Sequence, residues 1–157
     1  SGEEIPLICR ELKGNSAEAK RLIDIIQEIT TSRVEFWHLK GDLKGFYRKG
    51  DDLIVVKKDM DDLATIKTLI HELAHSILHK DTVKSKEQKE IEAEAIAYVV
   101  NNYFNLDTSE YSFEYIANYS EKKTPEQLRK ILTDIQSTAK TIINQILEKG
   151  REVTEQC

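Results

Sequence analysis

Two histidines and a glutamate with the spacing of a metal site lie together in the sequence, at His71, Glu72 and His75. On a helix, residues four positions apart lie on one face, so both imidazoles can bind one metal ion. Glu72 projects from the adjoining face, where its carboxylate can reach a water molecule bound to that ion. This H-E-x-x-H arrangement supplies two metal ligands and a general base, and its chemistry is metal-assisted hydrolysis. It requires that residues 71–75 are helical and that a third ligand completes the site.

The third ligand has to come from another part of the chain, because a catalytic zinc site usually has three protein ligands and an open position. His79 continues the same helix, but it lies about 12 Å along the axis from His71, too far for both to bind one ion. We interpret His79 as a residue that supports a ligand, lines the cleft or packs in the core. Asp81 stands six residues after His75, where some zinc peptidases place a third ligand. That placement needs a glycine where this chain has Leu78, which argues against Asp81.

The acidic segment 87–94 offers a better third ligand. Glu90 and Glu94 are four residues apart and share a helix face, whereas Glu92 is predicted to point elsewhere. We predict that Glu90 binds the metal and that Glu94 accepts a hydrogen bond from the free nitrogen of a ligand histidine, which fixes the tautomer. Glu94 as the metal ligand instead of Glu90 is the alternative. Small apolar residues surround the pair, which argues against an ordinary solvated acidic face.

Apolar periodicity and capping residues predict helices around this motif. The motif falls inside a helix that Asp61 or Asp62 caps, and Pro125 follows the Thr124 cap of a long last helix. The predicted helices cover about residues 15–30, 61–78, 87–104 and 124–147. The first of them is expected to start at a cap at Asn15 or Ser16.

Strand signals lie between the first two predicted helices. Residues 34–39 are aromatic and β-branched, and residues 46–48 and 53–56 flank a glycine-containing loop typical of a hairpin. We therefore expect a small antiparallel sheet of about three strands. Residues 1–157 are predicted to form a single α+β domain, in which this sheet packs on a zincin-like helical domain with the H-E-x-x-H helix and a long C-terminal helix.

The composition favours a soluble protein of the cytoplasm. Of 157 residues, 39% are hydrophobic and 32% are charged, and no apolar run approaches the roughly 20 residues that cross a bilayer. The isolated Cys9 and Cys157 favour a reducing compartment. The net charge of −5 argues against direct nucleic-acid binding, and no membrane partner is expected because the chain has no apolar run long enough to cross a bilayer. Because the chain starts with Ser1-Gly2 rather than Met, we expect it to be excised from a longer protein.

The sequence resembles a known superfamily over these motifs. Residues 68–79, TLIHELAHSILH, are similar to the metallopeptidase motif of the ImmA/IrrE superfamily, and residues 90–100 resemble its next helix, where a glutamate is the third ligand. Residues 45–47, 106–109 and 111–117 are similar to the ArdC/LtrC-like branch of conjugative plasmids and transposons. ImmA and IrrE relatives usually have Asn at the position of Glu94, whereas the ArdC branch has an acid there. The resemblance extends over about residues 30–145.

The resemblance implies a zinc-dependent endopeptidase with a protein or peptide substrate. Zn²⁺ would then bind His71, His75 and Glu90, with Glu72 as the general base. Family members often carry a domain that binds single-stranded DNA before the peptidase-like domain. The alternative function is a non-catalytic, metal-stabilised binding module in DNA-processing or antirestriction machinery.

Two features of the substrate site are left open by the sequence. His79, Tyr98 and Tyr115 are candidates for the cleft and for the donor that stabilises an oxyanion. If the strand at 53–56 is an edge of the sheet, a substrate could add to it as a further strand.

Overall fold

The computed structural model describes residues 17–109, 111 and 114–155, and it has the predicted mixed α+β composition. The predicted cap at residue 15 or 16 and both cysteines lie outside the described residues. In chain order the elements are α1 (Ala17–Ile29), β1 (Arg33–Trp37), β2 (Gly45–Arg48), the short 3₁₀ helix η2 (Lys49–Asp51), β3 (Leu53–Lys57), α2 (Asp62–Leu78), α3 (Lys86–Tyr103), α4 (Glu114–Glu121) and α5 (Pro125–Glu155).

The three strands form a mixed sheet in the order β1-β3-β2. β2 and β3 are the predicted antiparallel hairpin, with Gly45 opposite Val56. β1 runs parallel to β3, with Arg33 opposite Leu53, so the prediction of an antiparallel sheet is wrong for this pair. Residues 53–56 are all fully buried, as expected of a strand that is covered on both faces. β3 is therefore the central strand, paired on both sides and closed to a further strand, and β1 and β2 are the edges of the sheet.

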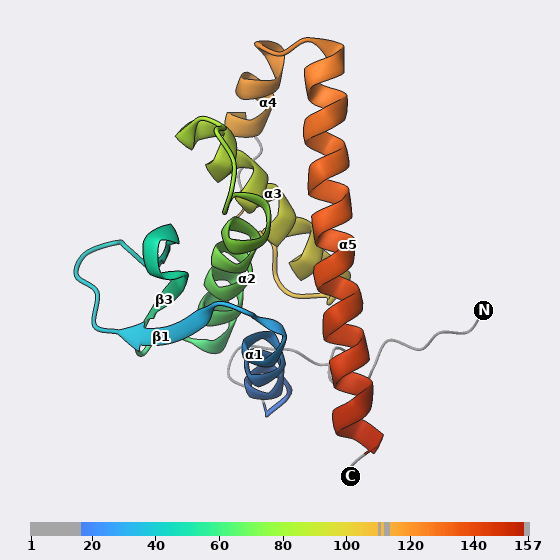
Figure 1. Cartoon of the computed structure of the whole chain (residues 1–157). Helices are drawn as coiled ribbons and strands as arrows, with labels where there is room; N and C mark the ends of the chain where they lie inside the picture. The colour runs from blue at the N-terminus through green and yellow to red at the C-terminus, as the bar shows by residue number, and fades with distance from the viewer. Residues whose placement is uncertain (1–16, 110, 112–113, 156–157) are drawn as a thin grey trace.

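The motif helix α2 lies in the middle of the molecule, between the sheet and α5 (Figure 1). The side chain of Asp61 caps it by accepting a hydrogen bond from the Ala64 amide at 2.7 Å. α2 packs against α1, α3, β2 and β3, so its apolar residues have neighbours on several sides. The same helix also buries polar side chains in a continuous stripe at positions 65, 68, 72, 75 and 79.

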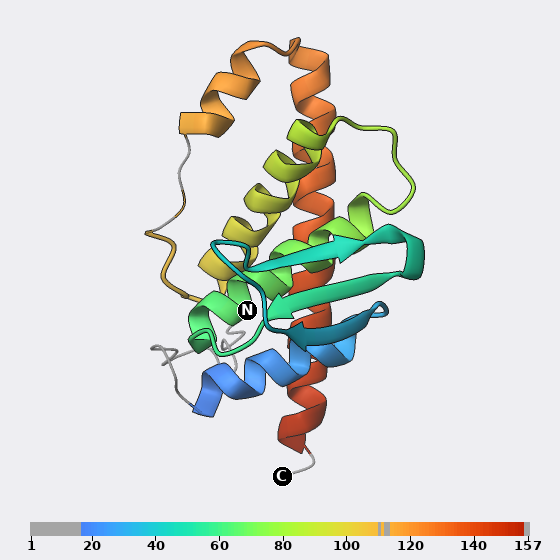
Figure 2. The same cartoon turned by 90° about the vertical axis from the view of Figure 1, so that its left-hand side faces the viewer.

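Two further helices complete the support of α2. The Ser85 hydroxyl caps α3 by accepting from the Gln88 amide at 3.2 Å. α5 begins with a capping box, in which Thr124 and Gln127 exchange hydrogen bonds of 3.0 and 3.1 Å. α5 then runs along α3 and α1 (Figures 1 and 2). None of the helices in the described ranges has the length and apolarity needed to cross a membrane.

The edge strand β2 is held tightly against α2. A side chain at Gly45 would place its Cβ 2.6 Å from the Thr68 methyl group and 2.6 Å from the Val55 carbonyl oxygen, so only glycine fits this approach. At the far end of the hairpin, the Asp52 carboxylate accepts hydrogen bonds from Tyr47 at 3.0 Å and Lys80 at 3.0 Å. Because Lys80 follows α2, both ends of β2 are fixed relative to the motif helix.

Candidate metal centre

Three predicted ligands meet where α2 faces α3. His71 Nε2 lies 3.2 Å from one carboxylate oxygen of Glu90, and His75 Nε2 lies 3.1 Å from the other. The potential ligand atoms of these three side chains all lie within 4.8 Å of one another. We refer to His71, His75 and Glu90 as the candidate metal centre. Local helix spacing brings the histidines together, and the packing of α3 on α2 adds the carboxylate.

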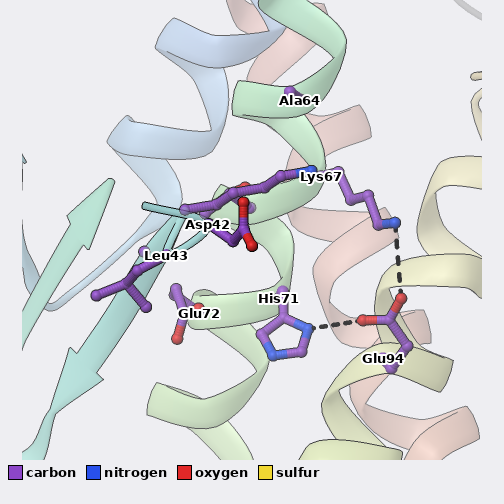
Figure 3. A pocket seen from close by; sticks show the side chains of 10 residues that line it. Asp42, Leu43, Ala64, Lys67, His71, Glu72 and Glu94 are labelled. Carbon is purple, nitrogen blue, oxygen red and sulfur yellow. Dashed lines mark hydrogen bonds and ion pairs between the residues drawn. The ribbon is translucent and has the colours of Figure 1, made fainter. Parts of the chain in front are cut away.

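Glu94 holds the second nitrogen of His71. Its carboxylate lies 3.1 Å from His71 Nδ1, with Lys67 3.7 Å from its other oxygen (Figure 3). Burial disfavours a charged ring, but the hydrogen bonds to Glu90 and Glu94 outweigh it and raise the pKa of His71 to about 10. The hydrogen bonds from both histidines hold the pKa of Glu90 well below its ordinary value. A cation between Glu90 and the imidazoles, either a proton or a metal ion, is therefore favoured.

The second nitrogen of His75 is held by a different route. His75 Nδ1 lies 2.8 Å from His79 Nδ1, and His79 Nε2 lies 2.9 Å from the Glu92 carboxylate. Burial lowers the pKa of His79 although Glu92 opposes that shift, so we assign a neutral ring. Its Nε2–H then donates to Glu92, and its Nδ1 accepts a hydrogen bond from His75 Nδ1–H. This assignment leaves His75 Nε2, 3.1 Å from Glu90, as the ring atom available to a metal ion.

Glu92 belongs to a buried group of charges behind the candidate metal centre. Its side chain is 0% exposed, and Lys84 lies 3.0 Å from its carboxylate. Lys84 also lies 3.2 Å from Asp134 of α5. Although burial opposes ionisation, His79 and Lys84 hold the pKa of Glu92 below its ordinary value. We call His79, Glu92, Lys84 and Asp134 the inner polar chain.

The donor atoms of the candidate metal centre fit a zinc ion. Two imidazole nitrogens and one carboxylate oxygen are a ligand set that catalytic zinc sites use, and the potential ligand atoms here lie within 4.8 Å of one another. Two further carboxylates, those of Glu72 and Glu94, lie beside this centre. Because the imidazoles must carry no proton on Nε2 when they bind a metal ion, zinc binding competes with protons at this site.

Glu72 lies beside the candidate metal centre, where a general base is expected. Its side chain is buried and lines two cavities, of about 270 and about 650 Å³, on either side of it. Figure 3 shows its carboxylate between His71 and Leu43. Burial, reinforced by the charge of Glu90 and opposed by His71, raises the pKa of Glu72 to about 7. A carboxyl group with a pKa in this range can both accept and return a proton near neutral pH.

The remaining predicted site residues lie in three different settings. His79 is buried and lines the larger cavity. Tyr98 packs edge-to-face on Tyr111, with ring centroids 5.4 Å apart, and lines neither cavity. Tyr115 is 53% exposed on α4 and also lines neither cavity. Asp81 is exposed and is not part of the cluster around His71.

The inner polar chain adds to the sequence interpretation of α3. Glu92 does point away from Glu90 and Glu94, but it points into the protein interior and holds His79. The signal that could have revealed it is the polar stripe of α2, whose spacing of three and four residues continues from Glu72 and His75 to His79. The partners Lys84 and Asp134 lie 50 residues apart, and no local pattern connects them.

Comparison with known proteins gives a family but no activity. A family model described as "Protein of unknown function (DUF3920)" matches residues 14–123. An uncharacterized protein of Bacillus anthracis, pXO2-81, is 35% identical over 104 residues, which cover 64% of this chain and 18% of that protein. The chain thus spans about a fifth of the length of this relative. No solved structure matches the chain. Because the family model covers well over half of the sequence, including the whole candidate metal centre, the chain belongs to the DUF3920 family.

Proposed function

We propose that this domain is a zinc-dependent endopeptidase that hydrolyses peptide bonds in a protein substrate. The observation that carries the proposal is the convergence of His71 Nε2 and His75 Nε2 on Glu90, with Glu72 beside them at an open groove. A purely structural zinc site has no need of a carboxylate next to an open cavity. Because the cavities lie on both sides of Glu72, the substrate chain can continue in both directions, as an endopeptidase requires.

The chemistry divides between the metal ion and Glu72. Bound zinc would polarise the peptide carbonyl and lower the pKa of water to about 7. Glu72 would accept a proton from the attacking water on its carboxylate and deliver it to the nitrogen of the leaving amine. One water is consumed, the C–N bond breaks, and the products are a carboxylic acid and an amine. Glu94 and His79 would keep the ligand imidazoles in the tautomers that present Nε2 to the metal.

The edge of β2 offers a place for the substrate backbone. The Lys57 amide donates to the Lys44 carbonyl oxygen at 2.8 Å, so the alternation of an antiparallel ladder turns Gly45 and Tyr47 away from β3. Their backbone N–H and C=O groups face the free edge, and both residues line the larger cavity. A substrate segment that pairs with this edge would pass directly beside Glu72.

The resemblance to the ImmA/IrrE superfamily supports the same function. We accordingly propose a cytoplasmic peptidase domain of a mobile-element protein, of the ArdC/LtrC-like type. The relative in Bacillus anthracis is uncharacterized, and it contributes no activity to this proposal.

The proposal is tested by cleavage of a peptide mixture prepared from a bacterial proteome, with the products identified by mass spectrometry. The zinc-loaded wild type is compared with Glu72→Gln and with Glu148→Gln, which changes an exposed glutamate of α5. We expect Glu72→Gln to retain zinc and to lower the cleavage rate about 10²- to 10⁴-fold, the usual contribution of a general base. The Glu148→Gln control should cleave as the wild type does.

Two outcomes would contradict this function. Equal cleavage by wild type and Glu72→Gln would remove Glu72 from the mechanism. Zinc-loaded protein that cleaves no peptide would favour the alternative, a metal-stabilised binding module.

A further inference from the structure

The two cavities beside Glu72 form one groove along the edge strand. Both are lined by Leu43, Gly45, His71 and Glu72, so they meet at the candidate metal centre. The smaller cavity extends from there past Asp42, and the larger one extends past Tyr47 and Lys49. The groove therefore follows β2 from the loop before the strand to the turn after it.

The two ends of this groove differ in charge. At the end of the smaller cavity, Asp42 and Glu94 are balanced by Lys44 and Lys67. At the opposite end, the walls carry Lys49, Lys86 and Lys89, and the acidic side chains of that cavity are those of the candidate metal centre and Glu72. The groove thus has a neutral end and a basic end, in a protein whose net charge is −5.

The lysines of the basic end are available to a ligand. None of the three forms an ion pair with a residue that the structure describes. Lys86 is moreover the first residue of α3, where the positive end of the helix dipole disfavours a cation. Within the described ranges, no contact of these three charges stabilises the fold, whereas all three would attract an anion bound at this end of the groove.

We propose that the basic end of the groove is a specificity subsite, in which Lys49, Lys86 and Lys89 bind acidic side chains of the substrate. The inference rests on the proposed peptidase function, since it gives the class of peptide that the same groove takes. A peptide favours this place over a nucleic acid because the edge of β2 offers backbone hydrogen bonds, and because Glu72 and Glu90 repel a continuous line of phosphates.

Peptide binding to the Glu72→Gln variant tests the subsite without cleavage of the ligand. The ligands are ten-residue peptides with an apolar centre. One carries three Asp residues before the centre, a second carries three Asp residues after it, and each has a counterpart with Asn at the same positions. By isothermal titration calorimetry, we expect one of the two Asp peptides to bind about tenfold more tightly than its Asn counterpart, the effect of two or three exposed charge pairs. The preference should decline in high salt.

Charge-reversal variants identify the lysines that cause the preference for Asp. Lys49→Glu/Lys86→Glu should lose the preference for Asp and should prefer a peptide with Lys at the same positions. The matched double variant Lys122→Glu/Lys140→Glu changes the net charge equally at exposed positions that line neither cavity, and it should keep the Asp preference. Lys86→Glu places an acid in the first turn of α3, where it favours folding, so loss of structure does not mimic the expected result.

The outcomes separate the subsite from the peptidase function. Selective binding that follows the lysines, together with no cleavage by the wild type, would support the subsite and contradict only the peptidase function. Equal binding of Asp and Asn peptides, or cleavage without any acidic preference, would overturn the subsite and leave the peptidase function intact. Tighter binding of a ten-nucleotide single strand than of every peptide would also overturn it.

Discussion

Helix α3 contributes glutamates to two polar regions that differ in how their charges are balanced. In the inner polar chain, Glu92 and Asp134 face Lys84, and Lys130 lies 2.8 Å from Asp134. When Lys130 is included, two lysines match the two carboxylates of the chain, and Glu92 is fully buried. At the candidate metal centre, the partners of Glu90 are the two imidazoles, no lysine in the described part of the chain pairs with it, and its side chain is 48% exposed. The carboxylates of the inner chain are paired with lysines of the protein, whereas the proposed metal centre would take its cation from solution.

Because of this difference, mutations in the two regions should affect different properties, the stability of the fold in one and metal binding in the other. Removal of a charge from the inner polar chain should weaken the fold, because its partners remain buried without compensation. Removal of a ligand from the metal centre should chiefly weaken metal binding. The following experiments test this distinction.

The largest effect is expected for Glu92→Ala. Loss of this carboxylate leaves Lys84 and His79 without their buried partner, which should lower the free energy of unfolding by about 3–5 kcal/mol. Urea denaturation measures the change, and Glu148→Ala, at an exposed position, should stay within about 0.5 kcal/mol of the wild type. A loss below about 1 kcal/mol for Glu92→Ala would show that the chain is not balanced as described.

A double variant sharpens this result. Replacement of both charges by leucine, in Glu92→Leu/Lys84→Leu, should be less destabilising than either single change, because no unpaired charge of the pair stays buried. If the two single effects add, Glu92 and Lys84 are not coupled.

The next effect is the stabilisation of the fold by zinc. At a free zinc concentration of about 100 times its Kd, the free energy of unfolding should increase by about 2.7 kcal/mol. His75→Ala should abolish the increase, and His38→Ala, which removes an exposed histidine outside the centre, should retain it. An increase of equal size in both variants would place the zinc elsewhere.

A smaller change in affinity is expected for Glu94→Gln. The loss of the charged acceptor at His71 Nδ1 should weaken zinc binding about 10- to 100-fold, with the ligands themselves unchanged. Competition with a chromophoric chelator measures the Kd, and Glu87→Gln serves as a control on the same helix. Complete loss of zinc from Glu94→Gln with full retention by Glu90→Gln would exchange the roles of the two glutamates.

The smallest effect concerns acid stability through Asp134. Burial opposes its ionisation, but Lys130 and Lys84 hold the pKa of Asp134 below its ordinary 3.8. A depressed pKa stabilises the fold above about pH 3.8, and this contribution is lost as the pH falls through the lower folded-state pKa. The free energy of unfolding of the wild type should therefore be about 1 kcal/mol larger than that of Asp134→Asn at pH 6, and this difference should vanish in acid. Urea denaturation between pH 6 and pH 3 would contradict this if the difference were constant.

Local patterns predicted most of the fold but not the sheet pairing. The cap at Asp61, the capping box at Thr124 and the hairpin of β2 and β3 each depend on residues close in sequence. The parallel pairing of β1 with β3 depends on which strand takes the central place, and that choice is made by the burial of residues 53–56 under the helices. Such contacts between distant segments leave no periodic signal in the chain.

Sequence patterns likewise predicted only the part of the candidate site that depends on local helix spacing. His71, Glu72 and His75 are joined by helix geometry, and the spacing of Glu90 and Glu94 placed both on one face. The role of Glu92 could not be predicted because it depends on the depth of α3 against α2 and α5. Tyr98 and Tyr115 were plausible cleft residues by chemistry alone, and packing places them outside both cavities.

The metal content of protein purified without chelator or added metal shows whether the cluster between α2 and α3 is a zinc site. Inductively coupled plasma mass spectrometry should find about one zinc per chain in the wild type and in His38→Ala, and almost none in His71→Ala or Glu90→Ala. Wild-type protein that contains no zinc and takes up none on addition would contradict the account. Equal zinc in Glu90→Ala and wild type would contradict the ligand assignment.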